Sequence, residues 1–143
     1  AQVTVNDLCQ AVYFYGTDDK RHAFPNEKVF FTWFENFDNV VTVSQSFMST
    51  IPLGKNVTYH PGTRMVKFQS VPIVYAVSAG GILRAIASEE VASQLYGTNW
   101  NTQIDDISDA FIGNYTFGEK VLVSVDYDVA QAKTSVTGLN QQF

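Results

Sequence analysis

The sequence is poor in cysteine and in positive charge, and it has no long apolar run. Cys9 is the only cysteine, which excludes a disulfide within the chain and favours a buried thiol. Nine lysines and arginines stand against fourteen acidic residues, for a net charge of -5, whereas nucleic-acid binding requires basic patches. The longest apolar run, residues 71–77, contains Pro72 and falls short of the roughly 18 residues of a membrane helix. We therefore expect neither nucleic acid as a partner nor membrane insertion.

The sequence also lacks the motifs that carry catalysis. It contains no Gly-x-Ser-x-Gly elbow, no glycine-rich phosphate loop and no dinucleotide fingerprint. Neither His22 nor His60 has a cysteine or carboxylate at the spacing of a metal site. We therefore expect a protein that is not an enzyme, with no catalytic residues, no cofactor and no metal.

One group of acidic residues leaves an alternative open. Asp105, Asp106 and Asp109 lie close together, and Asp126 and Asp128 follow further along the chain. Calcium binding needs several converging oxygens, and the spacing here does not match an EF-hand loop. The first three residues are explained more simply as acids at the start of a helix, where negative charge is favourable.

The composition provides enough apolar material for a folded core. Hydrophobic residues make up 45% of the 143 residues, and aromatic residues make up 14%. Such a high aromatic content favours strands. The length suits one domain or two small fused units.

The clearest pattern is an internal repeat. Residues 12–57 match residues 74–121 in order, first at an offset of 62 and then, after a two-residue insertion near residues 98–101, at an offset of 64. Ordered matches at residues with structural roles indicate a duplication. The main pairs are Val12 and Val74, Tyr13 and Tyr75, Ala23 and Ala85, Asn26 and Ser88, Val29 and Val91, Phe34 and Tyr96, Ser44 and Ser108, Phe47 and Phe111, Gly54 and Gly118, and Val57 and Val121.

Both repeats predict the same order of elements. Each opens with a β-hairpin, because two alternating segments flank a turn rich in Gly and Asp. A helix follows, with Asn26 or Ser88 as its N-cap, and Gly97 ends the second helix. Ser44 and Ser108 then cap a further short helical turn. The hairpins are expected at residues 11–15 with 20–24, and at residues 73–77 with 82–86.

Two further segments have the pattern of strands. Residues 57–59 and 65–68 flank a turn, which predicts a hairpin between the repeats, and residues 121–129 alternate apolar and polar. We expect an α+β fold in which two duplicated β-hairpin-plus-short-helix units form one domain, with a central hairpin and terminal strands. The expected parts are an N-terminal extended segment 1–10, repeat unit 1 at 11–57, a linking hairpin 58–72, repeat unit 2 at 73–121, and a C-terminal strand and tail 122–143.

The two stretches VYFYGTDDKRHAFPNEKVFFTWF and VYAVSAGGILRAIASEEVASQLYGTNW carry a resemblance. Their pattern resembles tandem repeat modules of uncharacterised secreted and cell-surface proteins of bacteria and archaea. Those modules share a Val-Tyr strand, a turn, a Lys-Arg strand, a Pro-led helix, a Trp-containing loop and a Gly stop. The resemblance spans about residues 11–121 and implies a surface location, but it brings no catalytic residues. The second repeat departs from the pattern at residues 81–84, where only one basic residue is kept.

Four residues are candidates for contact with sugars. Asn56 and Asn114 begin Asn-x-Thr sequons, which makes them candidate glycosylation sites. Trp33 and Trp100 are candidate platforms for stacking on glycans, and packing in the core is the alternative explanation for them.

Two functions fit these features. The first is an extracellular structural subunit of a surface assembly, such as a filament, pilus or surface layer, in which copies of the chain are joined by donation of a terminal strand. A start at Ala1 without an initiator Met resembles a processed, secreted N-terminus. The alternative is a carbohydrate- or cell-wall-binding adhesion module with surface glycans as partners. The strands expected at the joint contain Gln2, Val3, Thr4 and Val5 near one end, and Val121, Val123 and Val125 near the other.

Overall fold

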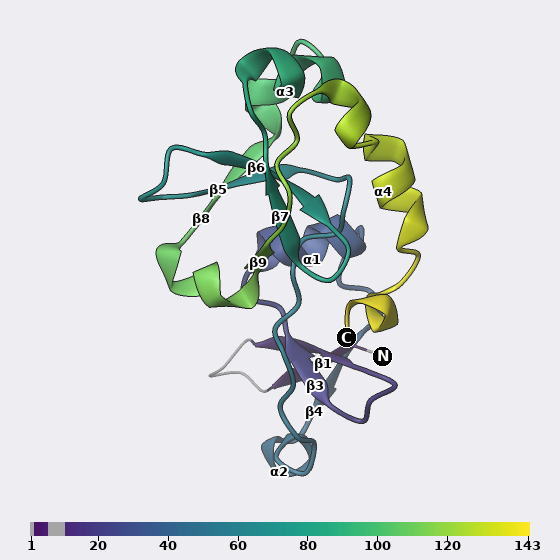
Figure 1. Ribbon diagram of the computed structural model, residues 1–143. Helices are drawn as coiled ribbons and strands as arrows, with labels where there is room; N and C mark the ends of the chain where they lie inside the picture. The colour runs from purple at the N-terminus through teal and green to yellow at the C-terminus, as the bar shows by residue number, and fades with distance from the viewer. Residues whose placement is uncertain (1, 6–10) are drawn as a thin grey trace. The chain divides into compact units, whose positions relative to one another are not determined.

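The structure is a computed structural model that describes residues 2–5 and 11–143 (Figure 1). The fold is α+β, as the sequence predicted. The chain divides into two compact units, which refines the expectation of one packed domain. Unit 1 is Ala1–Thr58 together with Gly138–Phe143, and unit 2 is Tyr59–Thr137. The thiol of Cys9, expected to be buried, lies outside the described residues.

Unit 1 is built on a four-stranded sheet in the order β3-β2-β1-β4. β1 pairs antiparallel with β2, and β2 pairs antiparallel with β3, whereas β1 and β4 run parallel. A parallel neighbour requires a crossover connection, which contains α1 here. The elements are β1 (Gln2–Val5), β2 (Val12–Tyr15), β3 (Arg21–Ala23), α1 (Glu27–Trp33), β4 (Val40–Val43), α2 (Gln45–Met48) and the 3-10 helix η4 (Leu139–Gln142).

Unit 2 is built on a five-stranded sheet in the order β8-β5-β6-β7-β9. β5, β6 and β7 pair antiparallel in sequence, while β8 runs parallel to β5 and β9 runs parallel to β7. The elements, with η marking 3-10 helices, are β5 (Met65–Phe68), β6 (Val74–Ser78), β7 (Ile82–Ala85), α3 (Glu89–Tyr96), η1 (Trp100–Gln103), β8 (Ile104–Ile107), η2 (Asp109–Asn114), β9 (Thr116–Phe117), η3 (Ser124–Asp126) and α4 (Val129–Ser135).

The two sheets share one topology over their first four strands. β5, β6, β7 and β8 pair in the same order and the same directions as β1, β2, β3 and β4. The register agrees as well, because Val3 faces Tyr13 in unit 1 and Val66 faces Tyr75 in unit 2. Common strand order and register are what a duplication predicts, and the duplication itself stays an inference from the sequence.

Backbone hydrogen bonds recur between matched residues of the two repeats. Gly54 N donates to Arg21 O at 2.9 Å in unit 1, and Gly118 N donates to Leu83 O at 2.8 Å in unit 2. These bonds tie the segment that follows the short second helix to the outer strand of the hairpin. The other matched bonds are Val57 N to Ala23 O and Val121 N to Ala85 O, both 2.8 Å, and Phe24 N to Val12 O at 3.0 Å and Ile86 N to Val74 O at 2.9 Å.

The predicted helix caps are confirmed. Asn26 Oδ1 accepts a hydrogen bond from Val29 N at 3.0 Å, and Ser88 Oγ accepts one from Val91 N at 3.2 Å. Each bond satisfies an amide that the first helical turn leaves without a partner. Gly97 ends α3 with a φ of 90°, a backbone conformation that favours glycine.

The linking hairpin expected at residues 58–72 does not form. Residues 57–59 are in no strand, and β5 pairs with β6 and β8 instead. Met65, Val66 and Phe68 are at most 1% exposed, so β5 is covered on both of its faces. A strand buried in this way belongs inside a sheet, and β5 is therefore the first strand of unit 2.

The strand expected at residues 121–129 is also wrong. Val121 forms only an isolated bridge with Ile86, and a 3-10 helix follows at η3. Val129 then begins α4, the longer yellow helix in Figure 1. The alternation of valines in this stretch therefore does not reflect a strand.

Two aspartates explain why this segment turns. Asp126 Oδ2 accepts hydrogen bonds from Leu122 N at 3.0 Å and Val123 N at 3.1 Å. Asp128 Oδ1 accepts one from Gln131 N at 2.9 Å and so caps α4. Short polar side chains that bind nearby amides compete with strand pairing, and in this segment their hydrogen bonds replace a strand.

His22 on β3 is buried in unit 1 at 1% exposure. Its Nδ1 donates to Lys55 O at 2.6 Å, and its Nε2 lies 3.0 Å from Asp18 Oδ2. The ring of Phe143 stacks on the imidazole with centroids 3.5 Å apart. Gly54 lies against the same ring, so closely that a side chain there would overlap it. The pairing with Asp18 was not foreseen from the sequence.

We predict that Gly54→Ala destabilises the protein by about 1 to 3 kcal/mol, because a methyl group would overlap the imidazole ring of His22. Gly113→Ala is the matched control, since a Cβ at Gly113 meets no atom within 4 Å. Urea denaturation measures both. Equal unfolding free energies for the two variants would contradict the close packing of Gly54 on His22.

Candidate functional site

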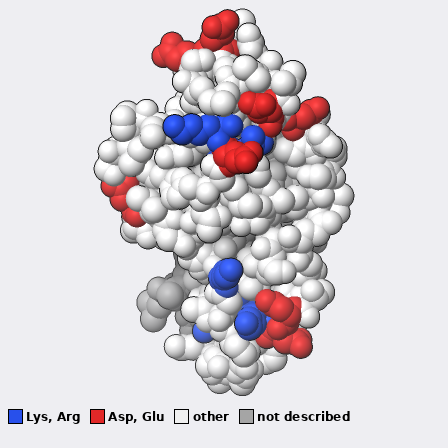
Figure 2. All heavy atoms as spheres, viewed as in Figure 1, with Lys and Arg blue, Asp and Glu red and all other residues white. Residues whose placement is uncertain are grey.

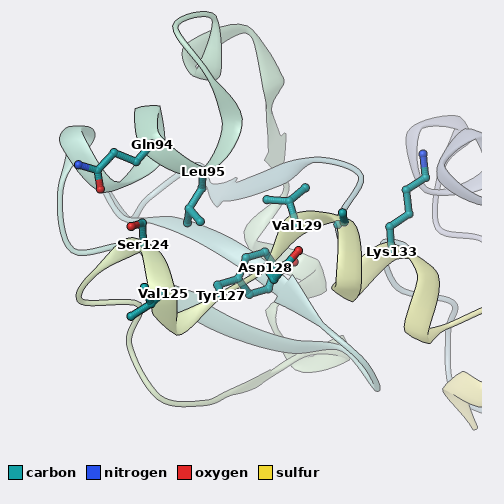
Figure 3. Close-up of a pocket in the computed structure, with 10 residues that line it drawn as sticks. Gln94, Leu95, Ser124, Val125, Tyr127, Asp128, Val129 and Lys133 are labelled. Atoms are coloured by element: carbon teal, nitrogen blue, oxygen red, sulfur yellow. The ribbon is translucent and has the colours of Figure 1, made fainter.

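The main candidate site is a groove of about 830 Å³ in unit 2 (Figure 3). α3 contributes one wall, and η3 and the start of α4 contribute the other. The lining is mixed, with apolar side chains beside an amide, a carboxylate and an amine. The lining residues are Gly62, Gln94, Leu95, Ser124, Val125, Tyr127, Asp128, Val129, Ala130 and Lys133.

Tyr127 anchors this groove to the core of unit 2. Its side chain is 6% exposed, and its hydroxyl donates to Val77 O on β6 at 2.7 Å. Burial raises the pKa of the Tyr127 hydroxyl above its usual value, so it stays a neutral donor. Ala76, Val91 and Val121 belong to the same buried cluster, which makes Tyr127 a fixed point of the wall.

The turn at Gly62, just before β5, holds α4 in place. Gly62 has a φ of 73°, and a Cβ there would lie 2.6 Å from Lys133 N, so only glycine permits this approach of the helix. His60 Nε2 donates to Val136 O at 2.8 Å, just beyond the end of α4. The histidine thus satisfies a carbonyl at the helix C-terminus.

An apolar loop forms the outer rim of the groove. We define it as residues 122–125, in which Leu122 is 62% exposed, Val123 52% and Val125 88%. The hydrogen bonds from Leu122 N and Val123 N to the Asp126 carboxylate fix the backbone of the loop. A constrained loop therefore presents three aliphatic side chains to solvent, with Val125 at the edge of the groove.

One polar side chain of the groove has a structural role of its own. The carboxylate of Asp128 caps α4, and Lys133 lies one turn further along the same helix. A second hollow of about 270 Å³ is also lined by Tyr127, together with Arg84. Arg84 is committed to two carbonyls, Glu119 O at 2.9 Å and Asp126 O at 2.8 Å. The arrangement suits an apolar side chain in the larger groove better than it suits proton transfer.

The two sequons differ in what surrounds their key atoms. The Nδ2 atom of Asn114, which would carry the sugar, is buried. In the other sequon, Thr58 is 5% exposed and its hydroxyl donates to Gln142 Oε1 at 2.6 Å. A glycan on either residue therefore requires local rearrangement, and glycosylation of Asn56 and Asn114 stays a prediction.

The two tryptophans lie in different units. Trp33 is half-buried on α1, and its Nε1 donates to Thr58 O at 2.9 Å. Trp100 is half-buried in η1 of unit 2. The hydrogen bond gives Trp33 a structural role, and neither indole lies on the groove. Glycan stacking by Trp33 and Trp100 stays a prediction.

The segments expected to join copies are engaged within their own units. The strand formed by Gln2, Val3, Thr4 and Val5 pairs with β2 on one side and β4 on the other. Val121 is 0% exposed and is bonded to β7 through Ala85 O. The backbone groups of these segments are paired within their own units, and donation of a terminal strand stays a prediction.

Val123 and Val125 have a different position from the one expected. They belong to the apolar loop and not to a strand. Sequence reasoning named both residues for strand donation and missed the groove. The sequence signal for the loop was Asp126, because aspartate side chains accept hydrogen bonds from nearby amides in turns.

The aspartates that left calcium open as an alternative are bonded to basic or polar groups. Asp105 is 7% exposed; its Oδ1 accepts from Arg64 Nε at 2.7 Å and its Oδ2 accepts from Tyr59 Oη at 2.8 Å. Asp106 lies 3.4 Å from Lys67 Nζ on the surface. These partners stabilise unit 2 and explain the acids without calcium. Across residues 2–5 and 11–143, no three His, Cys, Asp or Glu side chains gather as a metal cluster.

No helix within the described part of the chain combines the length and the apolar character needed to cross a membrane.

No protein-family model matches this chain, and no curated protein or solved structure is significantly similar to it.

We predict that Arg64→Met costs roughly 3 kcal/mol of stability, because it leaves the carboxylate of Asp105 buried with only Tyr59 as a partner. Lys67→Met is the matched control, and we expect it to cost under about 1 kcal/mol, since its ion pair is exposed. Chemical denaturation measures the difference. A larger loss for Lys67→Met would contradict the structural role of the buried pair.

We predict that Asp109→Asn destabilises the protein at neutral pH and that this loss of stability disappears in acid. Hydrogen bonds from the Ser70 side chain and backbone hold the pKa of Asp109 below its usual value. A carboxyl with a lowered folded-state pKa adds stability above its unfolded pKa, and the gain is lost as the pH falls through the folded value. The gap between wild type and variant should therefore close between about pH 5 and pH 2. A gap that is constant over this range in urea denaturation would contradict the Ser70 contact.

Proposed function

We propose that this chain is an extracellular structural subunit of a surface assembly, in which copies of the chain bind one another. The apolar loop at residues 122–125, beside a groove of about 830 Å³, carries this proposal. Clustered aliphatic side chains in water mark protein contact sites, because burying them releases their hydration shell.

A second copy is the partner that this surface fits best. Val125 protrudes from the loop and also lines the groove, so one small region offers both a projection and a hollow. In a two-fold contact each copy inserts its projection into the hollow of the other. Leu95 and Val129 on the groove walls provide apolar contacts for an inserted valine.

The charge distribution supports contact between copies. On the face shown in Figure 2, basic side chains lie beside acidic ones in a few small clusters, and wide areas between these clusters carry no charge. Such areas pack against a copy of themselves without repulsion. The net charge of -5 keeps the free chain soluble before it assembles.

The location outside the cell is carried by the sequence resemblance to secreted and cell-surface repeat modules. Glycan binding remains the alternative prediction, and a glycan array with the intact protein tests it separately. Bound glycans together with a purely monomeric protein would favour adhesion over assembly.

We predict that the purified chain associates with increasing concentration, and that Val125→Asp weakens this association at least about tenfold. The substitution places a charge where the contact would bury it without a partner. Analytical ultracentrifugation and negative-stain microscopy measure the size of the particles. The monomer has a mass of 15.9 kDa.

Leu53→Asp is the matched control, because Leu53 is 61% exposed and lies in the other unit. It introduces the same charge without touching the groove of unit 2. A wild-type protein that is monomeric at every accessible concentration contradicts the proposed function. Equal weakening by both variants contradicts the role of the apolar loop.

A further inference from the structure

The hydrogen bonds of His22 in unit 1 require a charged ring. Its Nδ1 lies 2.6 Å from Lys55 O, and its Nε2 lies 3.0 Å from Asp18 Oδ2. A backbone carbonyl and an ionised carboxylate can only accept hydrogen bonds, so both ring nitrogens have to donate. A neutral imidazole has one N–H group, whereas the imidazolium has two. The buried ring therefore carries a proton on each nitrogen when both bonds are made.

Asp18 supplies the negative charge that faces this ring. Hydrogen bonding to His22 lowers the pKa of the Asp18 carboxyl, so the carboxyl is ionised at neutral pH. Lys55 offers its backbone carbonyl to the ring. Residues 138–143, which pack on the ring from the far end of the chain, contain no charged side chain. The charge on the ring thus depends on its pairing with Asp18.

Two charged residues beside this pair are bound to other partners. Asp19 Oδ1 accepts a hydrogen bond from Tyr15 Oη at 3.0 Å. Arg21 Nε donates to Ile51 O at 3.0 Å. Asp18 is therefore the charged side chain within hydrogen-bonding distance of the imidazole.

The matched place in unit 2 holds a permanent cation. Arg84 matches His22 at the offset of 62, and Glu119 matches Lys55 at the offset of 64. Arg84 Nε donates to Glu119 O at 2.9 Å, just as the ring of His22 donates to Lys55 O. An arginine is always charged, whereas a histidine changes its charge between about pH 5 and pH 8. Unit 1 thus has a titratable group where unit 2 has a fixed one.

An aromatic ring covers the cation in both units. Phe143 stacks on His22 with ring centroids 3.5 Å apart and planes 12° from parallel. Tyr127 lies under Arg84, with Cζ 6.0 Å from the centroid. An aromatic face attracts a cation, and the attraction grows where water is excluded. The contact between Phe143 and the imidazole is therefore strongest when the imidazole is charged.

Residues 138–143 are bound to unit 1 through three side chains. Asn140 Oδ1 accepts from Thr17 N at 2.9 Å, and Gln142 Oε1 accepts from Thr58 Oγ1 at 2.6 Å. The third is the ring of Phe143. The first two contacts are between uncharged groups, so Phe143 is the contact that responds to the charge of the imidazole.

We infer that His22 is a proton-controlled latch, whose charged ring holds residues 138–143 on unit 1 and whose deprotonation releases them. The proton lost from Nε2 passes to solvent, and the lone pair left behind points at the carboxylate of Asp18. This repulsion and the lost hydrogen bond displace the ring, and with it the face on which Phe143 stacks. The inference concerns a single copy and does not depend on self-association.

The direction of the pH dependence follows from the charge that the latch needs. A charged histidine contributes its stabilisation on the acid side of its titration, and the contribution is lost as the pH rises. The segment is therefore docked near pH 5 and released near pH 8, the range over which histidine changes charge. This direction is opposite to that expected for the carboxyl of Asp109.

The amide of Thr17 reports whether the segment is docked, because it donates to Asn140. Hydrogen exchange of the full chain at low protein concentration, corrected for the intrinsic rate at each pH, gives its protection. We expect this protection to fall at least about tenfold between about pH 5 and pH 8. Nuclear Overhauser contacts between Phe143 and His22 should disappear over the same range. Protection and contacts that stay constant in wild type overturn the latch.

Asp18→Asn should abolish this pH dependence and keep the segment docked. An amide can accept from a charged ring or donate to a neutral one, so His22 is satisfied in both states. Asp19→Asn is the matched control, since Asp19 bonds Tyr15 and not His22, and it should keep the pH dependence of wild type.

A second histidine provides the competing explanation. His60 Nε2 donates to Val136 O, two residues before the segment, and Asp18→Asn leaves this bond in place. Release that persists in Asp18→Asn therefore overturns the latch and assigns the pH dependence to His60. Ring nitrogen chemical shifts of His22 in wild type give a readout that needs no variant. Two protonated nitrogens at about pH 5 support the latch, and one contradicts it.

Discussion

In each unit the first strand is held from both sides, by an antiparallel neighbour that follows directly and by a parallel neighbour that arrives only after a helix. The parallel partner cannot reach its place through a tight turn, so β4 and β8 depend on the crossovers that contain α1 and α3. The caps at Asn26 and Ser88 fix where these helices begin. The rest of each unit is arranged around this constraint.

The same backbone frame accepts different side chains at matched positions. Gly54 and Gly118 donate equivalent hydrogen bonds, yet Gly54 lies against the ring of His22 and Gly118 against the side chain of Ile82. Val57 and Val121 are both fully buried. The frame therefore rests on backbone bonds and on small or β-branched residues at fixed places.

Local sequence signals predicted much of the fold, but they did not predict the pairing of strands that lie far apart along the chain. The hairpins, the N-caps and the end of α3 at Gly97 depend on neighbouring residues, and their sequence patterns were sufficient. The role of β5 was missed because its parallel partner lies far along the chain. The tail showed strand-like alternation, but Asp126 and Asp128 bind its amides and turn it. The groove combines α3, Gly62 and this tail, so no single stretch of sequence indicated it.

The two units differ in which stretches of the chain form them, and this determines the order in which they are completed during synthesis. Unit 2 is one uninterrupted stretch, so all of its residues are present once Thr137 has left the ribosome. Unit 1 also needs residues 138–143, among which Asn140 accepts a hydrogen bond from Thr17 N and Phe143 covers His22. The unit that is translated first is therefore the one completed last, and until then the imidazole of His22 lacks the ring that covers it.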